Sequence, residues 1–144
     1  MIMKIFELEK LPTWEEMKYE AVRIGLEGCE VFKMLDDETK AKEWNGIGPD
    51  RFSKLLRDFL DTLHSEVLPA ACIHDFRFVV GGSEADFHAA NLELKRNMDS
   101  CLRFYRRNFS LVGYWLAKLR VVIAYHLCEM FGYEGWNKRD NVIQ

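Results

Sequence analysis

The fold that we expect for this chain follows from the stretch LPAACIHDFRFVVGG, residues 68–82. This stretch carries a His-Asp doublet, His74 and Asp75, inside an apolar run with a proline near its start and two glycines at its end. Proline suits the first turn of an α-helix, and glycine suits the position that follows its last turn. The stretch therefore predicts a helix that begins near Pro69, stops at the glycine pair and holds two polar side chains among apolar ones.

The residues after the glycine pair predict a second long helix, over residues 84–107, that packs antiparallel to the first. Ser83 is a favourable residue to cap the start of this helix. Residues four apart share a helix face, so Phe78 should lie beside His74. The chain turns straight back at the glycines, and we therefore expect the second helix to face the first one.

A histidine that acts as a general base needs a partner from another element to orient its ring. Asp86, Asn91 and Asn97 are the polar residues of the second helix that could face His74. Asp75 points about 100° away from His74 around the helix, so the doublet cannot act on a single point.

The rest of the chain predicts a mainly α fold of four to five helices in one domain, residues 1–144. Thr13 and Glu16 have the spacing of a capping box and open an amphipathic helix over residues 12–35. Residues 36–44 either extend that helix or form a short second one. The remaining expected elements are an extended arm at 3–9, a break at 45–50, a helix over 50–67 and a last helix over 111–131. In outline, N-terminal helices span about 13–43, the doublet region about 44–108, and the C-terminal helix follows.

The composition is that of an ordered globular protein without an electrostatic case for nucleic acid. Of 144 residues, 49% are hydrophobic, ten are Phe, four are Trp and only three are Pro, and the net charge is −3. The charge is uneven: residues 1–50 carry 7 basic and 12 acidic side chains, and residues 91–120 carry 7 basic and 2 acidic. The basic segment either faces an anionic surface, such as lipid headgroups, or faces the acidic segment within the fold.

Four widely separated cysteines, without a C-x-x-C pair, suggest reduced thiols that serve as small core residues. The N-terminus has no secretory signal, and no apolar run reaches about 18 residues. We therefore expect a cytoplasmic protein without a membrane span. Trp115 and Trp136 are expected in the core. A zinc site from Cys72, His74 and His88 has no spacing motif to support it.

Three segments in this order resemble the phospholipase A2 family, and most closely its small, disulfide-free bacterial and phage-encoded members. They read NGIGP at 45–49, AACIHDFRF at 70–78 and ANLELKRNM at 90–98. The family pattern is approximately N-G-C-G-P, then A-C-x-x-H-D-x-x-Y, then A-D-x-x-F-x-x-x-M. The resemblance implies a helical phospholipase A2-like domain whose two antiparallel helices carry the His-Asp motif.

The resemblance also implies an activity, the calcium-dependent hydrolysis of a phospholipid acyl ester. His74 matches the general base that deprotonates water, and Asp75 matches the carboxylate ligand of calcium. The backbone carbonyls of Trp44, Gly46 and Gly48 match the calcium loop. A phospholipid or membrane surface would then be the partner, and a phage-encoded member could be associated with the virion.

Two departures from the family pattern weaken the implied base. Asn91 stands where the family has the Asp that orients the base, and Phe78 stands where a Tyr would bond that Asp. An amide cannot balance the charge of an imidazolium ion. Asp86 either substitutes for the missing carboxylate or caps a helix with Ser83. The alternative prediction is a catalytically weak or inactive phage- or prophage-derived protein of the same fold, with a structural or binding role.

Overall fold

The structure of the protein is a computed structural model, and it describes residues 12–44 and 63–138. The helices in this part are α2 (Trp14–Ile24), α3 (Asp37–Glu43), α5 (Leu68–Val80), α6 (Glu84–Phe104) and α7 (Leu111–Phe131). Short 3-10 turns lie between them: η1 (Cys29–Lys33), η2 (Ser65–Val67), η3 (Arg106–Asn108) and η4 (Tyr133–Gly135). No β-strand occurs in these residues, and the mainly α prediction is confirmed.

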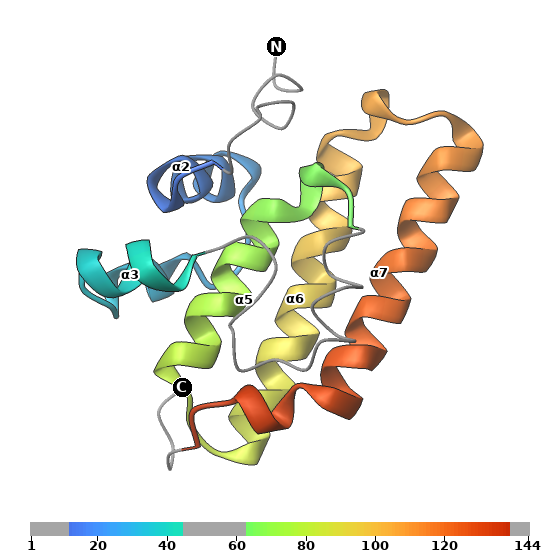
Figure 1. Ribbon diagram of the computed structural model, residues 1–144. Helices are drawn as coiled ribbons and strands as arrows, with labels where there is room; N and C mark the ends of the chain where they lie inside the picture. The colour runs from blue at the N-terminus through green and yellow to red at the C-terminus, as the bar shows by residue number, and fades with distance from the viewer. Residues whose placement is uncertain (1–11, 45–62, 139–144) are drawn as a thin grey trace.

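The three long helices α5, α6 and α7 lie side by side as a row, and the chain reverses direction between each pair (Figure 1). α2 and α3 pack against α5, and α7 forms the other edge of the row (Figure 1). The predicted antiparallel packing of the first two long helices is confirmed. Because α6 is the middle helix, its side chains can reach both neighbours.

The turn between α5 and α6 explains this pairing. Gly81 has a φ of 73°, and a Cβ atom there would lie 1.8 Å from the Asn137 carbonyl oxygen. Only glycine fits such a position without strain. The Ser83 hydroxyl then accepts from the Asp86 N–H, and the Asp86 carboxylate accepts from the Ser83 N–H, which forms a capping box. The glycine at 81 thus ends α5, and the Ser83–Asp86 capping box starts α6.

The C-terminal segment closes over this turn. The Trp136 indole donates to the Gly82 carbonyl at 3.0 Å, and the Gly82 N–H donates to the Asn137 carbonyl at 2.9 Å. The Trp136 ring also meets the Phe78 ring edge-on, with centroids 5.0 Å apart. Trp136 is buried, as predicted.

The apolar core lies between the row of long helices and the two short N-terminal ones. Its largest fully buried apolar side chains come from α2, η1, α5, α6 and the η2 turn: Met17, Val31, Phe32, Val67, Ile73, Phe76, Phe78, Phe87, Met98 and Leu102. All four cysteines are free thiols, and Cys72, Cys101 and Cys128 are buried in this core. The prediction of thiols as small core residues is confirmed for these three.

The predicted first helix over 12–35 is wrong beyond Ile24. The Thr13–Glu16 capping box is present, but Gly25 ends α2 with a φ of 84°, and its N–H bonds back to Ala21 and Val22. A left-handed glycine of this kind is a common helix stop. Cys29 therefore lies in η1 rather than on the face of α2.

The segment that follows η1 forms a separate short helix, which was one of the two options. The Asp36 side chain accepts from the Thr39 N–H and starts α3. Of the helix predicted over 50–67, only the end is described, and there η2 is a 3-10 turn. Residues 50–62, the break at 45–49 and the arm at 3–9 lie outside the described residues.

The last helix has the predicted bounds, but Trp115 on it is not a core residue. Trp115 is 61% exposed, so that prediction is wrong. The physical reason is the place of α7 at the edge of the row, where α6 covers only one side. The residues on that side are small: Ala117, Val121, Ala124 and Cys128.

Candidate functional site

The ring of His74 is hydrogen-bonded to the side chain of Asn91 across the α5–α6 interface. The distance from His74 Nε2 to Asn91 Oδ1 is 2.7 Å. Both residues are buried, with exposed fractions of 3% and 0%. Among the described residues Asn91 is the hydrogen-bond partner of His74, so no carboxylate there bonds the ring directly.

Glu129 on α7 fixes which way round the Asn91 amide lies. Asn91 Nδ2 donates to Glu129 Oε2 at 2.6 Å, and a carboxylate can only accept. The amide oxygen therefore faces His74, so His74 Nε2 must donate. Nδ1 is then the unprotonated nitrogen of a neutral imidazole ring.

The hydrogen bonds continue from Glu129 toward the surface. His88 Nδ1 lies 2.9 Å from each Glu129 carboxylate oxygen, and the Tyr125 hydroxyl lies 3.4 Å from Oε1. The bond to Glu129 is the main cause that raises the pKa of His88 above its ordinary value. His74, Asn91, Glu129 and His88 thus form a chain, here called the polar chain, from the core to an exposed imidazole.

The environment of His74 makes it a weak base. Burial lowers its pKa from 6.5 to about 4, because an imidazolium ion would lose its hydration there. The Phe78 ring packs on the imidazole at a centroid distance of 4.5 Å, as expected from their spacing. A general base works best when its pKa is near the working pH, so this His74 suits hydrogen bonding better than proton abstraction at neutral pH.

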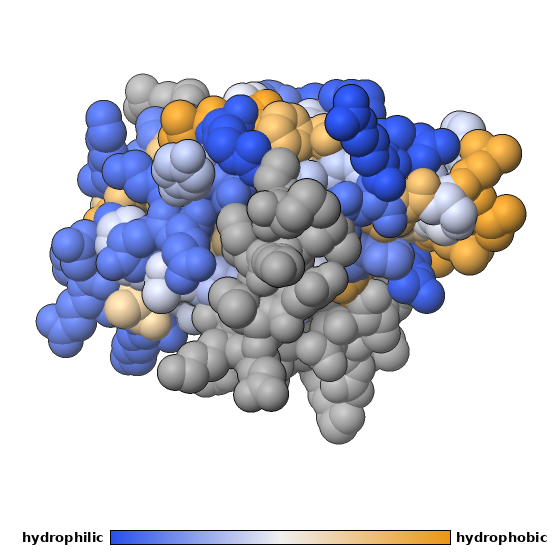
Figure 2. Space-filling view, turned by 90° about the horizontal axis from the view of Figure 1, so that it is seen from above, coloured by the Kyte–Doolittle hydropathy of each residue, from blue (hydrophilic) through white to orange (hydrophobic). Residues whose placement is uncertain are grey.

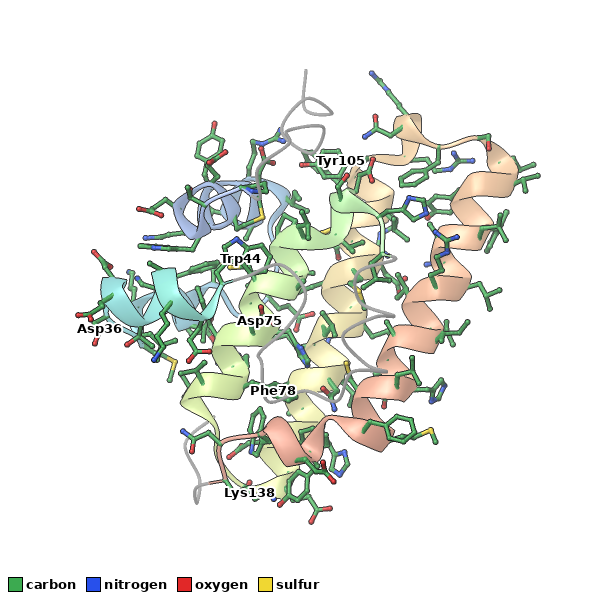
Figure 3. The ribbon with its side chains drawn as sticks, viewed as in Figure 1. Asp36, Trp44, Asp75, Phe78, Tyr105 and Lys138 are labelled. Atoms are coloured by element: carbon green, nitrogen blue, oxygen red, sulfur yellow. The ribbon has the colours of Figure 1, made fainter. Side chains whose placement is uncertain are left out.

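Asp75 and Phe78 lie one turn apart along α5 (Figure 3). Asp75 is buried, with 3% of its surface exposed. Burial is the main cause that raises the pKa of the Cys128 thiol to about 12, and the charge of Asp75 is the second. Cys128 belongs to the buried face of α7. The charge of the Asp75 carboxylate is therefore felt in the interior of the protein, among the three long helices.

The predicted calcium ligands are only partly described. Trp44 is the residue that ends α3, and its indole donates to the Pro12 carbonyl at 2.7 Å. Gly46 and Gly48 lie outside the described residues. Within the described residues no group of three or more His, Cys, Asp or Glu side chains is arranged to hold a metal ion. Calcium binding stays a prediction.

The other two polar candidates on α6 have structural partners. Asp86 bonds the backbone at Ser83, so the structure places it in the helix cap and not beside the imidazole ring. Asn97 bonds both the N–H and the carbonyl of Glu27 and ties α6 to the turn after α2. Of the three candidates, only Asn91 meets His74.

Glu129 is the residue of this site that sequence reasoning missed. A signal was present, because Glu129 is the only Asp, Glu, Lys or Arg in residues 121–131 of an otherwise apolar helix end. A lone charge in such a run needs a partner when it packs against a neighbour. The partner on α6 could not be read from the chain order alone.

A second feature is the outward face of α7, which we define by the six large apolar side chains of this helix that are at least half exposed. Their exposed fractions run from 50% to 70%: Leu111, Val112, Trp115, Leu116, Leu119 and Met130. Seen from above, hydrophobic residues gather at the right-hand edge of the molecule, the side on which α7 lies (Figure 2). Soluble monomers rarely expose so continuous an apolar stripe unless it binds something.

α7 also satisfies the length and composition of a membrane-crossing helix, unlike any other helix of the described residues. It has 21 residues, and its most apolar 18-residue stretch has a mean hydropathy of 1.3 and is 22% buried. From the sequence we expect no membrane span, because no uninterrupted apolar run reaches about 18 residues. Lys118 and Arg120 interrupt the run in α7, and the mean hydropathy over 18 residues is nevertheless high.

Comparison with known proteins adds no relative: no protein-family model, curated protein or solved structure matches this chain. The likeness to phospholipase A2 therefore rests on the sequence motifs given above.

Proposed function

We propose that this protein is a non-catalytic binding protein whose binding surface is the outward face of α7. The observation that carries the proposal is the set of six large apolar side chains on one side of a helix, each at least half exposed. The opposite side of the same helix is buried against α6. A helix that is apolar on both sides has one side left for a partner.

The polar chain supports this proposal with a structural role. It joins the three helices of the row through Asn91, with His74 on α5 and Glu129 on α7. A buried polar group is stable only when it is hydrogen-bonded, so the chain favours one register of α7 on α6. In this proposal the His-Asp motif serves the architecture that positions α7, which is the inactive alternative expected from the sequence.

The exposure of the outward face can be measured with the two tryptophans of the C-terminal half. Trp115 is 61% exposed and Trp136 is 3% exposed. In dilute protein we expect N-bromosuccinimide to oxidise Trp115 much faster than Trp136, as followed by mass spectrometry of tryptic peptides. Equal protection of both residues would mean that the chain itself covers this face, and the proposal would fail.

A second candidate function is hydrolysis of a phospholipid ester with His74 as the base. The observation that favours it is the hydrogen bond from Nε2 to Asn91, which orients the ring and leaves Nδ1 to accept a proton. The burial of His74 and its low pKa oppose it.

Fatty-acid release from anionic phospholipid vesicles separates the two functions. The assay compares wild type, His74→Ala and the control His64→Ala, each with calcium and with a chelator. His64 precedes the turn η2 and belongs neither to the polar chain nor to the outward face of α7. We expect no release that depends on His74. Release that is lost in His74→Ala and kept in His64→Ala would establish the hydrolase and overturn the non-catalytic proposal.

A further inference from the structure

We propose that the outward face of α7 binds a second copy of this chain, as an antiparallel, two-fold symmetric helix pair. This inference rests on the proposed function and names its partner. Three observations carry it: the spacing of the apolar residues, the placement of charge along α7, and the area of the face.

The spacing fits the packing of one helix on another. The seam residues are exposed and follow one another at intervals of three, four and three residues: Val112, Trp115, Leu119 and Val122. Intervals of this kind form a straight seam on one side of a helix. His126 is the next position of the series, so the seam holds no permanently charged residue.

The charged side chains of α7 lie beside the seam and are turned to the body of the protein. Lys118 and Arg120 lie about 100° to either side of Leu119 around the helix. Lys118 Nζ is 2.9 Å from Asp99 on α6, and the Arg120 guanidinium is 3.5 Å from the His64 ring. These cations are engaged within the chain, which favours a protein partner over an anionic lipid surface.

The basic start of α7 sets the direction of the pair. Arg106 and Arg107 form the turn η3 before the helix. The far end carries Glu134 in η4 and Lys138, whose ammonium group lies on the Tyr133 ring. A parallel pair would bring the two arginine pairs together. An antiparallel pair separates them and brings Arg107 of each copy toward Glu134 of the other, which steers and stabilises association.

The register follows from the middle of the helix. A two-fold axis level with Val121 places Leu119 opposite Ile123 of the second copy and Val112 opposite Met130. In the same register Arg107 lies close to Glu134 of the second copy. Such an interface is self-complementary, as closed two-fold symmetry requires.

The outward face is large for an exposed apolar surface. Six large side chains are at least half exposed, and an aromatic residue such as Trp115 alone buries about 150–250 Å² when it is covered. Their combined exposed area is on the order of several hundred Å², which approaches the roughly 800 Å² that each partner buries in a standard-size protein interface. α7 is about 31 Å long, which gives the pair its length.

The mass of the full chain in solution tests the proposal. We expect sedimentation equilibrium to give twice the 17.0 kDa chain mass at micromolar concentrations. Leu119→Glu should give a monomer with unchanged helical content. Val22→Glu, which changes a side chain on α2 with 60% exposure, should leave the dimer intact. A wild-type chain that stays monomeric up to high micromolar concentration would overturn the proposal.

Cysteine crosslinking tests the direction of the pair. A mixture of Val112→Cys and Met130→Cys chains should form a mixed disulfide under mild oxidation, and Val112→Cys alone should not crosslink. Crosslinking of Val112→Cys with itself would contradict the antiparallel arrangement. Arg107→Glu should weaken the dimer, and Glu134→Arg in the same chain should restore it.

Binding of α7 to a membrane would give a different result from self-association. A monomer that binds anionic vesicles through α7, and loses this binding in Leu119→Glu, would overturn self-association and keep the binding role. Fast oxidation of Trp115 in dilute protein that slows as the concentration rises would support the dimer. Protection of Trp115 at every concentration would contradict both proposals.

Discussion

Asn91 lies between His74 and Glu129 and hydrogen-bonds both, so it connects the buried imidazole to a carboxylate that the imidazole itself does not contact. The distances on the two sides of the amide are 2.7 Å and 2.6 Å. The carboxylate that the sequence motif lacks at position 91 is thus present one residue further along the polar chain, on a third helix.

The first prediction concerns Asn91→Asp, which places a carboxylate beside His74. The new carboxylate would face Glu129 at the present 2.6 Å separation, without the amide donor between them. A buried carboxylate and the partly buried Glu129 carboxylate repel each other, so we expect a loss of about 2 kcal/mol in the free energy of unfolding. Urea unfolding measures this loss. The double variant Asn91→Asp/Glu129→Gln restores a donor and should recover most of the stability; no recovery would contradict the pairing.

The second prediction concerns pH. The pKa of His74 falls from 6.5 in the unfolded chain to about 4 in the fold, so the unfolded chain binds more protons between these values. The contribution of neutral His74 to the free energy of unfolding is therefore fully present above pH 6.5. It is lost as the pH falls toward 4, and the loss amounts to about 3 kcal/mol. His88 has the opposite shift, so its contribution is complete below pH 6.5 and does not change in this window.

Urea unfolding at half-unit steps from pH 7 to pH 4 checks this prediction. His74→Gln keeps a donor for Asn91 and removes the titration, so its stability should change much less over the same range. Equal slopes for wild type and variant would show that His74 does not govern the acid sensitivity.

The third prediction compares two partners of the buried Arg77 guanidinium. Glu93 on α6 accepts two hydrogen bonds from it, each 3.0 Å long, and its side chain is 13% exposed. Glu30 accepts one at 2.8 Å but is 64% exposed. We expect Glu93→Ala to cost about 3 kcal/mol and Glu30→Ala less than about 1 kcal/mol, because only the first leaves the buried charge without its main partner. Thermal unfolding of the two variants at pH 7 would reveal the difference.

The fourth prediction compares two glycines with positive φ. Gly25 has φ 84° and ψ 37°, in the left-handed helical region, whereas Gly81 has φ 73° and ψ −160°, a region open essentially to glycine alone. A Cβ atom on Gly25 meets nothing within 4 Å, whereas on Gly81 it meets the Asn137 carbonyl oxygen at 1.8 Å. Gly25→Ala should cost about 1 kcal/mol for the left-handed conformation alone, and Gly81→Ala considerably more, because its backbone conformation excludes alanine and the C-terminal segment must move as well. Similar melting temperatures for both variants would contradict this prediction.

The stretch around the His-Asp doublet predicted its surroundings well wherever the cause was local. The bounds of α5 near Pro69 and Gly81, the Ser83 cap of α6 and the contact of Phe78 with His74 all depend on residues within a few positions of one another. The first helix was predicted too long, because the left-handed stop at Gly25 competes with an amphipathic pattern that continues beyond it.

The helical class, the Thr13 and Ser83 caps and the bounds of α5 and α7 follow from the chain alone, because capping and turn hydrogen bonds join neighbours along the chain. The second long helix was predicted too long, since α6 ends at Phe104 and not at residue 107. The role of Glu129 in the polar chain and the burial of the small residues of α7 against α6 depend on the tertiary structure. A helix that is apolar on two sides does not show which side its neighbours cover. The packing of α6 left the side with Trp115 outward, and that choice created the surface from which we infer the partner.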